Sequence, residues 1–209
     1  MRKKDLIVLV HGIDSPFISK NTLAQLSIVL RQQACFRDAF VLTSTVNKQR
    51  TRDGVEMLAT RLVWEIEEAA RDNGWDESAR GIRLSLVGHS LGGIVCRYAA
   101  YLLHAKGHLG TRFLPVSFVA IGSPHLGVRR ASTVLGYLQA WGGELLYGGS
   151  RTLEELMLRD KPSDGSGVPL LMRMAAGDFL AALSAFRLTL VSAIAFDHQV
   201  THCSSAITL

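Results

Sequence analysis

Cysteine is scarce in this sequence, with three residues in a chain of 209. Cys35, Cys96 and Cys203 are an odd number and form no C-x-x-C pair, which argues against a disulfide framework and against a structural zinc site. Reduced thiols suit a cytoplasmic protein, and that is the location we expect. Cys96 falls in an apolar helical segment, where we expect a buried and unreactive thiol.

The sequence also lacks a stretch dominated by charge of one sign. The formal net charge of +5 comes mostly from scattered arginines, and the densest clusters, Arg2-Lys3-Lys4 and Arg129-Arg130, are too short for a nucleic-acid stripe. A nucleic-acid partner is therefore not expected, whereas peripheral contact with an anionic membrane surface stays open. No metal-ligand cluster and no nucleotide-binding loop stand out, so we expect neither a metal nor a cofactor.

No apolar run is long enough to indicate a signal peptide or a membrane span. The run from Leu6 to Val10 is shorter than the apolar region of a signal peptide, and no small-residue cleavage site follows it. The longer run from Phe179 to Phe196 is interrupted by Arg187. A short helix followed by a buried strand explains it better than a transmembrane helix does.

Segments with strand and helix patterns alternate along the chain. Continuously apolar runs rich in β-branched residues predict buried strands, and apolar residues at helical spacing predict helices. The expected strands cover 5–10, 39–46, 81–90, 116–124 and 188–196, and the expected helices cover 21–34, 53–75, 91–107 and 169–186. This alternation predicts one α/β domain over residues 1–209, built on a mostly parallel, doubly wound sheet.

Two further features complete the expected domain. Residues 126–169 break the strand–helix rhythm and are rich in glycine, which predicts an insertion that forms a cap or lid over the mouth of the sheet. The helix expected over 53–75 is amphipathic and should stop at Gly74. Its expected core residues are Val55, Leu58, Leu62, Trp64 and Ile66.

The segment from Gly88 to Gly92 reads Gly-His-Ser-Leu-Gly, the G-x-S-x-G pattern of a serine hydrolase. An apolar strand pattern precedes it and a helical pattern follows it, which is the context of a sharp turn that exposes the serine. Glycines on both sides of Ser90 leave room where strand and helix nearly touch. Ser90 is therefore the candidate nucleophile, and the Leu91 N–H at the helix N-terminus is a candidate oxyanion donor.

The dipeptide His11-Gly12 ends the first expected strand and is a second candidate element. A turn at this place can supply another backbone donor to an oxyanion, and we assign that donor to the Ile13 N–H. Taken alone, the dipeptide also fits an ordinary turn at the end of a strand.

Several stretches together resemble the putative serine esterase family of α/β-hydrolases. The resemblance implies an α/β-hydrolase fold and the hydrolysis of carboxylic esters, acyl-lipids among them. It also implies that Asp197, which follows the last expected strand, is the acid of the catalytic triad. The matching stretches are LIVLVHGI, TRDGVEMLATRLVWEI, LSLVGHSLGGIVCRYA, IGSPHLGV, PLLMRMA and FDHQVTHCSSAI, and of these TRDGVE and SPHLGV are more specific than the elbow.

The histidine of the triad is harder to place. Proteins of the family it resembles carry this residue beyond a further strand, and this chain stops at Leu209, so we expect the C-terminal strand and helix of the fold to be missing. His202 is the best substitute, because a loop could fold it back from Asp197 toward the elbow. Plainer structural roles suit the other histidines, namely His11, His89, His104, His108, His125 and His198.

Two functions of different class remain. The first is a serine esterase or lipase in which Ser90 attacks an ester carbonyl, a histidine takes its proton and an acyl-serine forms. Apolar residues of the expected cap favour an acyl chain as substrate, although they suit a small internal core equally well: Leu135, Leu138, Trp141, Leu145 and Leu146. The second is a truncated or catalytically degenerate protein of the same fold that binds a lipid or a partner.

Overall fold

The computed structural model describes residues 4–14, 22–75, 79–127, 149–161 and 167–192. In these ranges a five-stranded, all-parallel sheet has the strand order β2-β1-β3-β4-β5. The parallel α/β sheet predicted from the sequence is confirmed. The strands are β1 (Asp5–Val10), β2 (Phe40–Thr43), β3 (Ile82–His89), β4 (Phe113–Ile121) and β5 (Leu188–Ser192).

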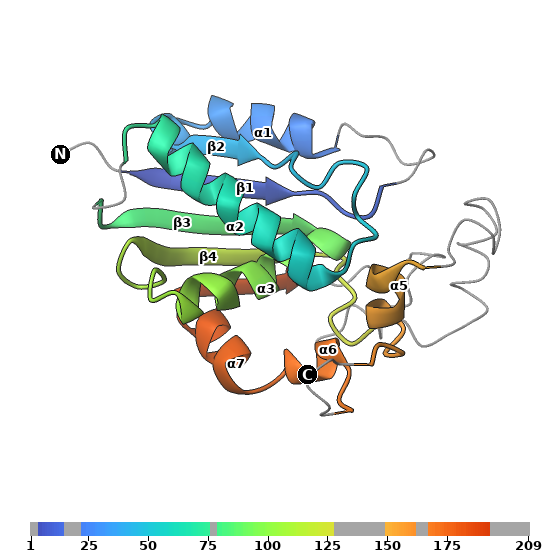
Figure 1. Cartoon of the computed structure of the whole chain (residues 1–209). Coiled ribbons are helices and arrows are strands. Elements are labelled where there is room, and N and C mark those ends of the chain that lie inside the picture. The colour runs from blue at the N-terminus through green and yellow to red at the C-terminus, as the bar shows by residue number, and fades with distance from the viewer. Residues whose placement is uncertain (1–3, 15–21, 76–78, 128–148, 162–166, 193–209) are drawn as a thin grey trace.

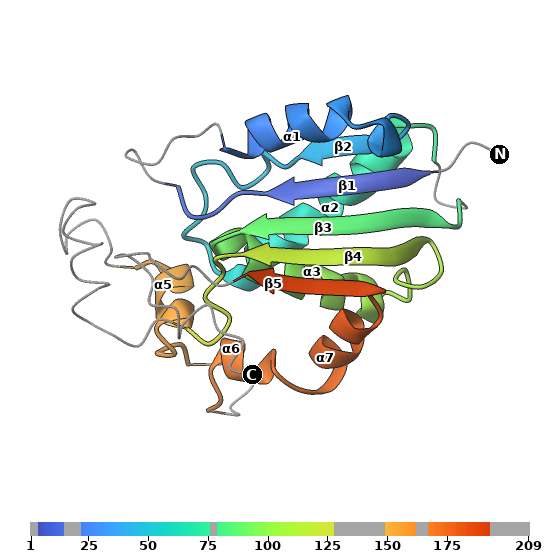
Figure 2. The ribbon, with the colours of Figure 1, turned by 180° about the vertical axis from the view of Figure 1, so that it is seen from behind.

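Helices pack on both faces of the sheet. The helices are α1 (Thr22–Gln32), the short 3-10 helix η1 (Ala34–Phe36), α2 (Val55–Asp72), α3 (Leu91–Ala105), α5 (Arg151–Leu156), α6 (Leu170–Arg173) and α7 (Gly177–Ser184). Figure 1 shows α2 and α3 crossing one face, and Figure 2 shows the sheet from behind, with α1 beside β2. The larger apolar core lies under α2 and α3, and a smaller one under α1 contains Ile7, Leu9, Leu23 and Val41.

The order of the strands positions the functional end of the sheet. From β1 the chain moves outward to β2, then returns past β1 and continues through β3, β4 and β5. The direction therefore reverses between β1 and β3. In sheets of this type, ligands bind in the crevice outside the carboxyl ends of the strands at the point of reversal. Val10 and His89 end the two strands there.

Trp64 does not belong to the core as expected, because its side chain is 56% exposed while Leu62 and Ile66 are fully buried. Each residue turns an α-helix by 100°, so Trp64 lies nearly opposite both of them. Val63 fills the core in its place. The remaining expected core residues of α2 are buried as predicted, and the helix ends just before Gly74.

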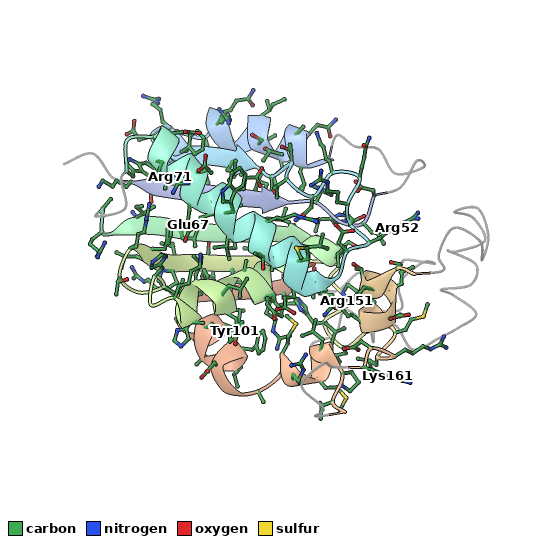
Figure 3. All side chains as sticks on the ribbon, viewed as in Figure 1. Arg52, Glu67, Arg71, Tyr101, Arg151 and Lys161 are labelled. Carbon is green, nitrogen blue, oxygen red and sulfur yellow. The ribbon has the colours of Figure 1, made fainter. Side chains whose placement is uncertain are left out.

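The helix expected over 169–186 is in fact two helices. Ala176 between them is extended, with φ −143° and ψ 176°, and Gly177 has a φ of 57°. The chain therefore turns between α6 and α7 and brings Phe179 onto Tyr101 of α3, with ring centroids 3.9 Å apart; Figure 3 labels Tyr101. Within the described ranges, no helix is both long and apolar enough to cross a membrane.

Candidate active site

Ser90 occupies the sharp turn between β3 and α3, as the G-x-S-x-G pattern predicted. Its backbone has φ 54° and ψ −125°, a region that non-glycine residues rarely adopt and that costs about 1–3 kcal/mol. A hydrogen bond of 2.9 Å from Ser90 N to Ile121 O holds the turn against the end of β4. Although Ser90 stands at the N-cap of α3, its hydroxyl makes no capping bond, so the oxygen stays available for chemistry.

The glycines around Ser90 are required by close backbone contacts. A Cβ on Gly88 would lie 2.3 Å from Gly93 N, and one on Gly92 would lie 2.1 Å from Val10 O. Real Cβ atoms do not approach backbone atoms so closely, so strand and helix meet here only because both side chains are absent. This contact also brings the start of α3 against the end of β1.

The turn after β1 lies directly on the candidate nucleophile. A Cβ on Gly12 would come within 2.9 Å of Ser90 Cβ and 3.3 Å of Ser90 Oγ. In the described part of the chain, the Ile13 and Leu91 N–H groups have no hydrogen-bond acceptor. Each of the two segments that border Ser90 thus carries one backbone donor that is unpaired among the described residues, which is the arrangement an oxyanion site requires.

The His11 side chain fixes the orientation of the peptide between Gly12 and Ile13. His11 Nδ1 lies 2.7 Å from Gly12 O. A carbonyl oxygen can only accept, so Nδ1 carries the proton and donates it. In a trans peptide the C=O and the following N–H point in opposite directions. The Ile13 N–H is therefore directed away from His11.

The motif stretch SPHLG, just after β4, carries two buried polar side chains. Ser123 and His125 are buried, and in the described residues neither Ser123 Oγ nor either ring nitrogen of His125 has a hydrogen-bond partner. Burial, helped by the positive charge of Arg97, lowers the pKa of His125 to about 4. His125 is therefore neutral at physiological pH and lines the interior, which agrees with the structural role expected for it.

The triad partners cannot be placed in the same way. Asp197 and His202, as well as His198, lie outside the described residues. Among the residues that are described, none has a side chain hydrogen-bonded to Ser90 Oγ. Of the other histidines, His104 is exposed, and His108 Nδ1 lies 3.2 Å from Glu67 Oε1.

Two other expectations can be followed in the described residues. Cys96 is fully buried on α3, and burial raises the pKa of its thiol, so it is the unreactive thiol we predicted. The expected cap over 126–169 is described only in part, and this part includes α5. No group of three or more potential metal ligands occurs within the described ranges.

The motif stretch TRDGVE has a structural role that its sequence pattern did not indicate. In the structure, Thr51 of this stretch is hydrogen-bonded to Asp14 after β1, and Gly54 is hydrogen-bonded to Thr152 of α5. The specificity of the motif was the only signal in the sequence. Contacts with residues so distant along the chain leave no local periodicity to detect.

Comparison with known proteins identifies relatives of this chain. A sequence profile described as "Putative serine esterase" matches residues 1–207. Putative lipase ROG1 of Saccharomyces cerevisiae is 31% identical over 130 residues, and putative lipase C4A8.10 of Schizosaccharomyces pombe is 32% identical over 133 residues. Each match covers 61% of this chain, but only 18% and 16% of the respective relative.

A solved structure resembles the chain over its whole length. The mature lipase BlEst2 of Bacillus licheniformis has a TM-score of 0.53 at 15% identity, and the match covers 100% of this chain and 81% of the lipase. At this level of identity the likeness concerns the fold alone.

Proposed function

The chain belongs to the putative serine esterase family and has the α/β-hydrolase fold, and from this premise we propose that it hydrolyses carboxylic esters through an acyl-serine. The observation that carries the proposal is the position of Ser90. Its strained turn touches the loop after β1, and the Ile13 and Leu91 N–H groups on either side have no acceptor among the described residues. Each feature has its own part in the chemistry of acyl transfer.

In the proposed mechanism, Ser90 Oγ attacks the ester carbonyl carbon while a histidine takes the hydroxyl proton. We assign that base to His202 and the carboxylate that orients it to Asp197. The carbonyl oxygen becomes an oxyanion and accepts hydrogen bonds from the Ile13 and Leu91 N–H groups. Collapse expels the alcohol, which takes the proton from the histidine. Water then attacks the acyl-serine, releases the acid and restores Ser90.

Acyl-lipids are the substrates we propose. Both yeast relatives are named putative lipases, and the expected cap over 126–169 is rich in apolar residues that could receive an acyl chain. Such substrates reside in membranes, so we also propose that the protein is cytoplasmic and contacts a membrane surface peripherally. The net charge of +5 favours contact with an anionic membrane surface.

Labelling with a fluorophosphonate probe tests the nucleophile, because the probe reacts with an activated serine and not with a merely exposed one. We expect the purified chain to be labelled, Ser90→Ala to lose labelling completely, and His202→Ala to lose most of it. Ser184→Ala, at an exposed position on α7, is the matched control and should label like the wild type. Hydrolysis of p-nitrophenyl acetate, butyrate, octanoate and palmitate by the same proteins tests the preference for acyl chains.

A folded wild-type protein that takes up no probe would contradict this proposal. It would favour the second function, a protein with the same fold that binds a lipid or a partner without hydrolysing it. Labelling that persists in Ser90→Ala would place the reactive group elsewhere. Labelling that survives in His202→Ala alone would leave the enzyme intact and assign the base to another residue.

A further inference from the structure

The hydroxyl group of Thr51 holds the loop that carries the proposed oxyanion donor. Thr51 lies in the segment between β2 and α2 and is 4% exposed. Asp14 N donates a hydrogen bond of 3.0 Å to Thr51 Oγ1, and Thr51 Oγ1 donates one of 3.2 Å to Asp14 Oδ2. A single hydroxyl thus binds both the backbone and the side chain of one residue, which fixes its position and its orientation.

The residue that Thr51 holds comes directly after Ile13. Gly12, on the other side of Ile13, touches Ser90 and has its carbonyl bound by His11. The peptide that presents the Ile13 N–H is therefore fixed before the donor by His11 and after it by Thr51. The Ile13 side chain packs against the larger core. Losing either hydrogen bond would let this peptide rotate away from the nucleophile.

Thr51 can act as a fixed support because hydrogen bonds to α5 fix the 51–55 segment to which Thr51 belongs. Gly54 N donates to Thr152 Oγ1 at 2.9 Å, and Val55 N donates to Glu155 Oε2 at 2.7 Å. Both acceptors are side chains of α5, and both residues are almost completely buried. The region lies beyond the carboxyl ends of the strands, where Figure 3 labels Arg52 and Arg151. Movement of the 51–54 segment would break these buried bonds.

We infer that Thr51 is a positioning residue for ester hydrolysis, which fixes the oxyanion donor Ile13 through its paired hydrogen bonds to Asp14. This inference rests on the proposed function and deepens it, because it assigns a role to the TRDGVE motif. Thr51 does not touch the substrate. Its contribution is to stabilise the geometry in which the Ile13 N–H meets the developing oxyanion, an interaction that is stronger in the transition state than in the bound ester.

Steady-state kinetics with p-nitrophenyl butyrate test this role. Valine has nearly the shape of threonine but no hydroxyl, so we expect Thr51→Val to lower kcat about 10- to 100-fold, a smaller loss than the roughly 100- to 1,000-fold loss for deleting an oxyanion donor. KM should change less than about threefold, since ground-state binding is unaffected. Thr51→Ser restores the hydroxyl and should keep kcat within about threefold of the wild type.

Two further variants make the test specific. Asp14→Ala removes the carboxylate but keeps the backbone N–H of this position, which can still donate to Thr51. The kcat of this variant should therefore fall less than that of Thr51→Val. Thr60→Val removes a hydroxyl that binds only Glu56 O on the exposed side of α2, and its kcat should match the wild type. Should Thr51→Val melt below the assay temperature, Thr51→Ala removes the same hydroxyl with less bulk.

The outcomes separate this inference from the proposed function. A wild type without Ser90-dependent hydrolysis overturns both. An active wild type with an unchanged kcat in Thr51→Val overturns the inference alone. A loss in Thr51→Ser as large as that in Thr51→Val, or a loss carried by KM, also overturns it, because the hydroxyl would then not be the group that matters.

Discussion

His125 lies in the interior without a hydrogen-bond partner among the described residues, and this position should make the protein sensitive to acid. Its pKa falls from 6.5 to about 4 because burial, together with Arg97, disfavours the charged ring. The unfolded chain takes up a proton near pH 6.5 while the folded protein does not. Acid therefore favours the unfolded state, and His125 should lower the free energy of unfolding by about 3 kcal/mol between pH 6.5 and pH 4.

This effect can be measured by urea unfolding of the wild type and of His125→Gln at several pH values. His125→Gln cannot take up a proton, so the difference in unfolding free energy between wild type and His125→Gln should shrink or reverse as the pH falls from 6.5 to 4. It should be constant above pH 7.5 or so, where neither state binds the proton. His104→Gln, on the exposed end of α3, is the control and should follow the wild type. Parallel curves for His125→Gln and wild type would contradict the assigned pKa.

The N-terminus of α2 depends on side chains from another helix. Its N-cap is Gly54, which has a φ of 95° and no side chain to cap with. Glu155 of α5 accepts from Val55 N and also contacts Arg151 Nε at 3.3 Å. Burial raises the pKa of Glu155, while these two partners oppose that rise. The free-energy cost of burying the Glu155 carboxylate is thus partly offset by the hydrogen bond that it accepts from Val55 N at the start of α2.

Removing this cap should cost more than removing a carboxylate from the surface. In Glu155→Ala the Val55 N–H would be buried without an acceptor, so we expect the free energy of unfolding to fall by about 1–3 kcal/mol. Glu154→Ala changes the neighbouring, exposed carboxylate and should stay within about 0.5 kcal/mol of the wild type. Urea unfolding of both variants measures these changes. Equal decreases in unfolding free energy would mean that Glu155 does not cap α2.

How far the sequence predicts each element depends on whether the cause is local. The apolar run of β1, the amphipathic pattern of α2 and the glycine spacing around Ser90 are local, and all three elements formed where they were expected. The cap supplied by Glu155 depends instead on packing against a distant part of the chain. Glu155 and Val55 are 100 positions apart, so neither hydrophobic period nor propensity reports their contact.

The sheet assembles the candidate active site from segments that are far apart in sequence. Parallel strands end at the same edge, so the turn after β1, the elbow after β3 and the SPHLG stretch after β4 meet there. The first two segments were predictable because each carries its own glycine pattern. Thr51 was not, since it comes from the link between β2 and α2 and, among the described residues, is connected to the site through Asp14.

At the scale of the whole molecule, the edge of the sheet at β5 is exposed in the described ranges. In the described ranges β5 pairs with β4 on one side only. Leu188 and Leu190 are 57% and 52% exposed. They are two residues apart in one strand, so their side chains lie on the same face of the sheet. An exposed apolar edge strand is a site at which sheets of separate molecules join. We therefore predict that the described edge at β5 favours self-association at high concentration.

A single charge at this edge should reduce that association. Lysine on an edge strand disfavours pairing with a second strand, so we expect Leu190→Lys to raise the monomer fraction in sedimentation velocity runs over a range of concentrations, without lowering the melting temperature. Leu180→Lys replaces a leucine of similar exposure, 49%, on α7 and should associate like the wild type. If both variants sediment as the wild type does, β5 is not the surface through which molecules meet. If both become more monomeric, net charge rather than the strand edge controls association.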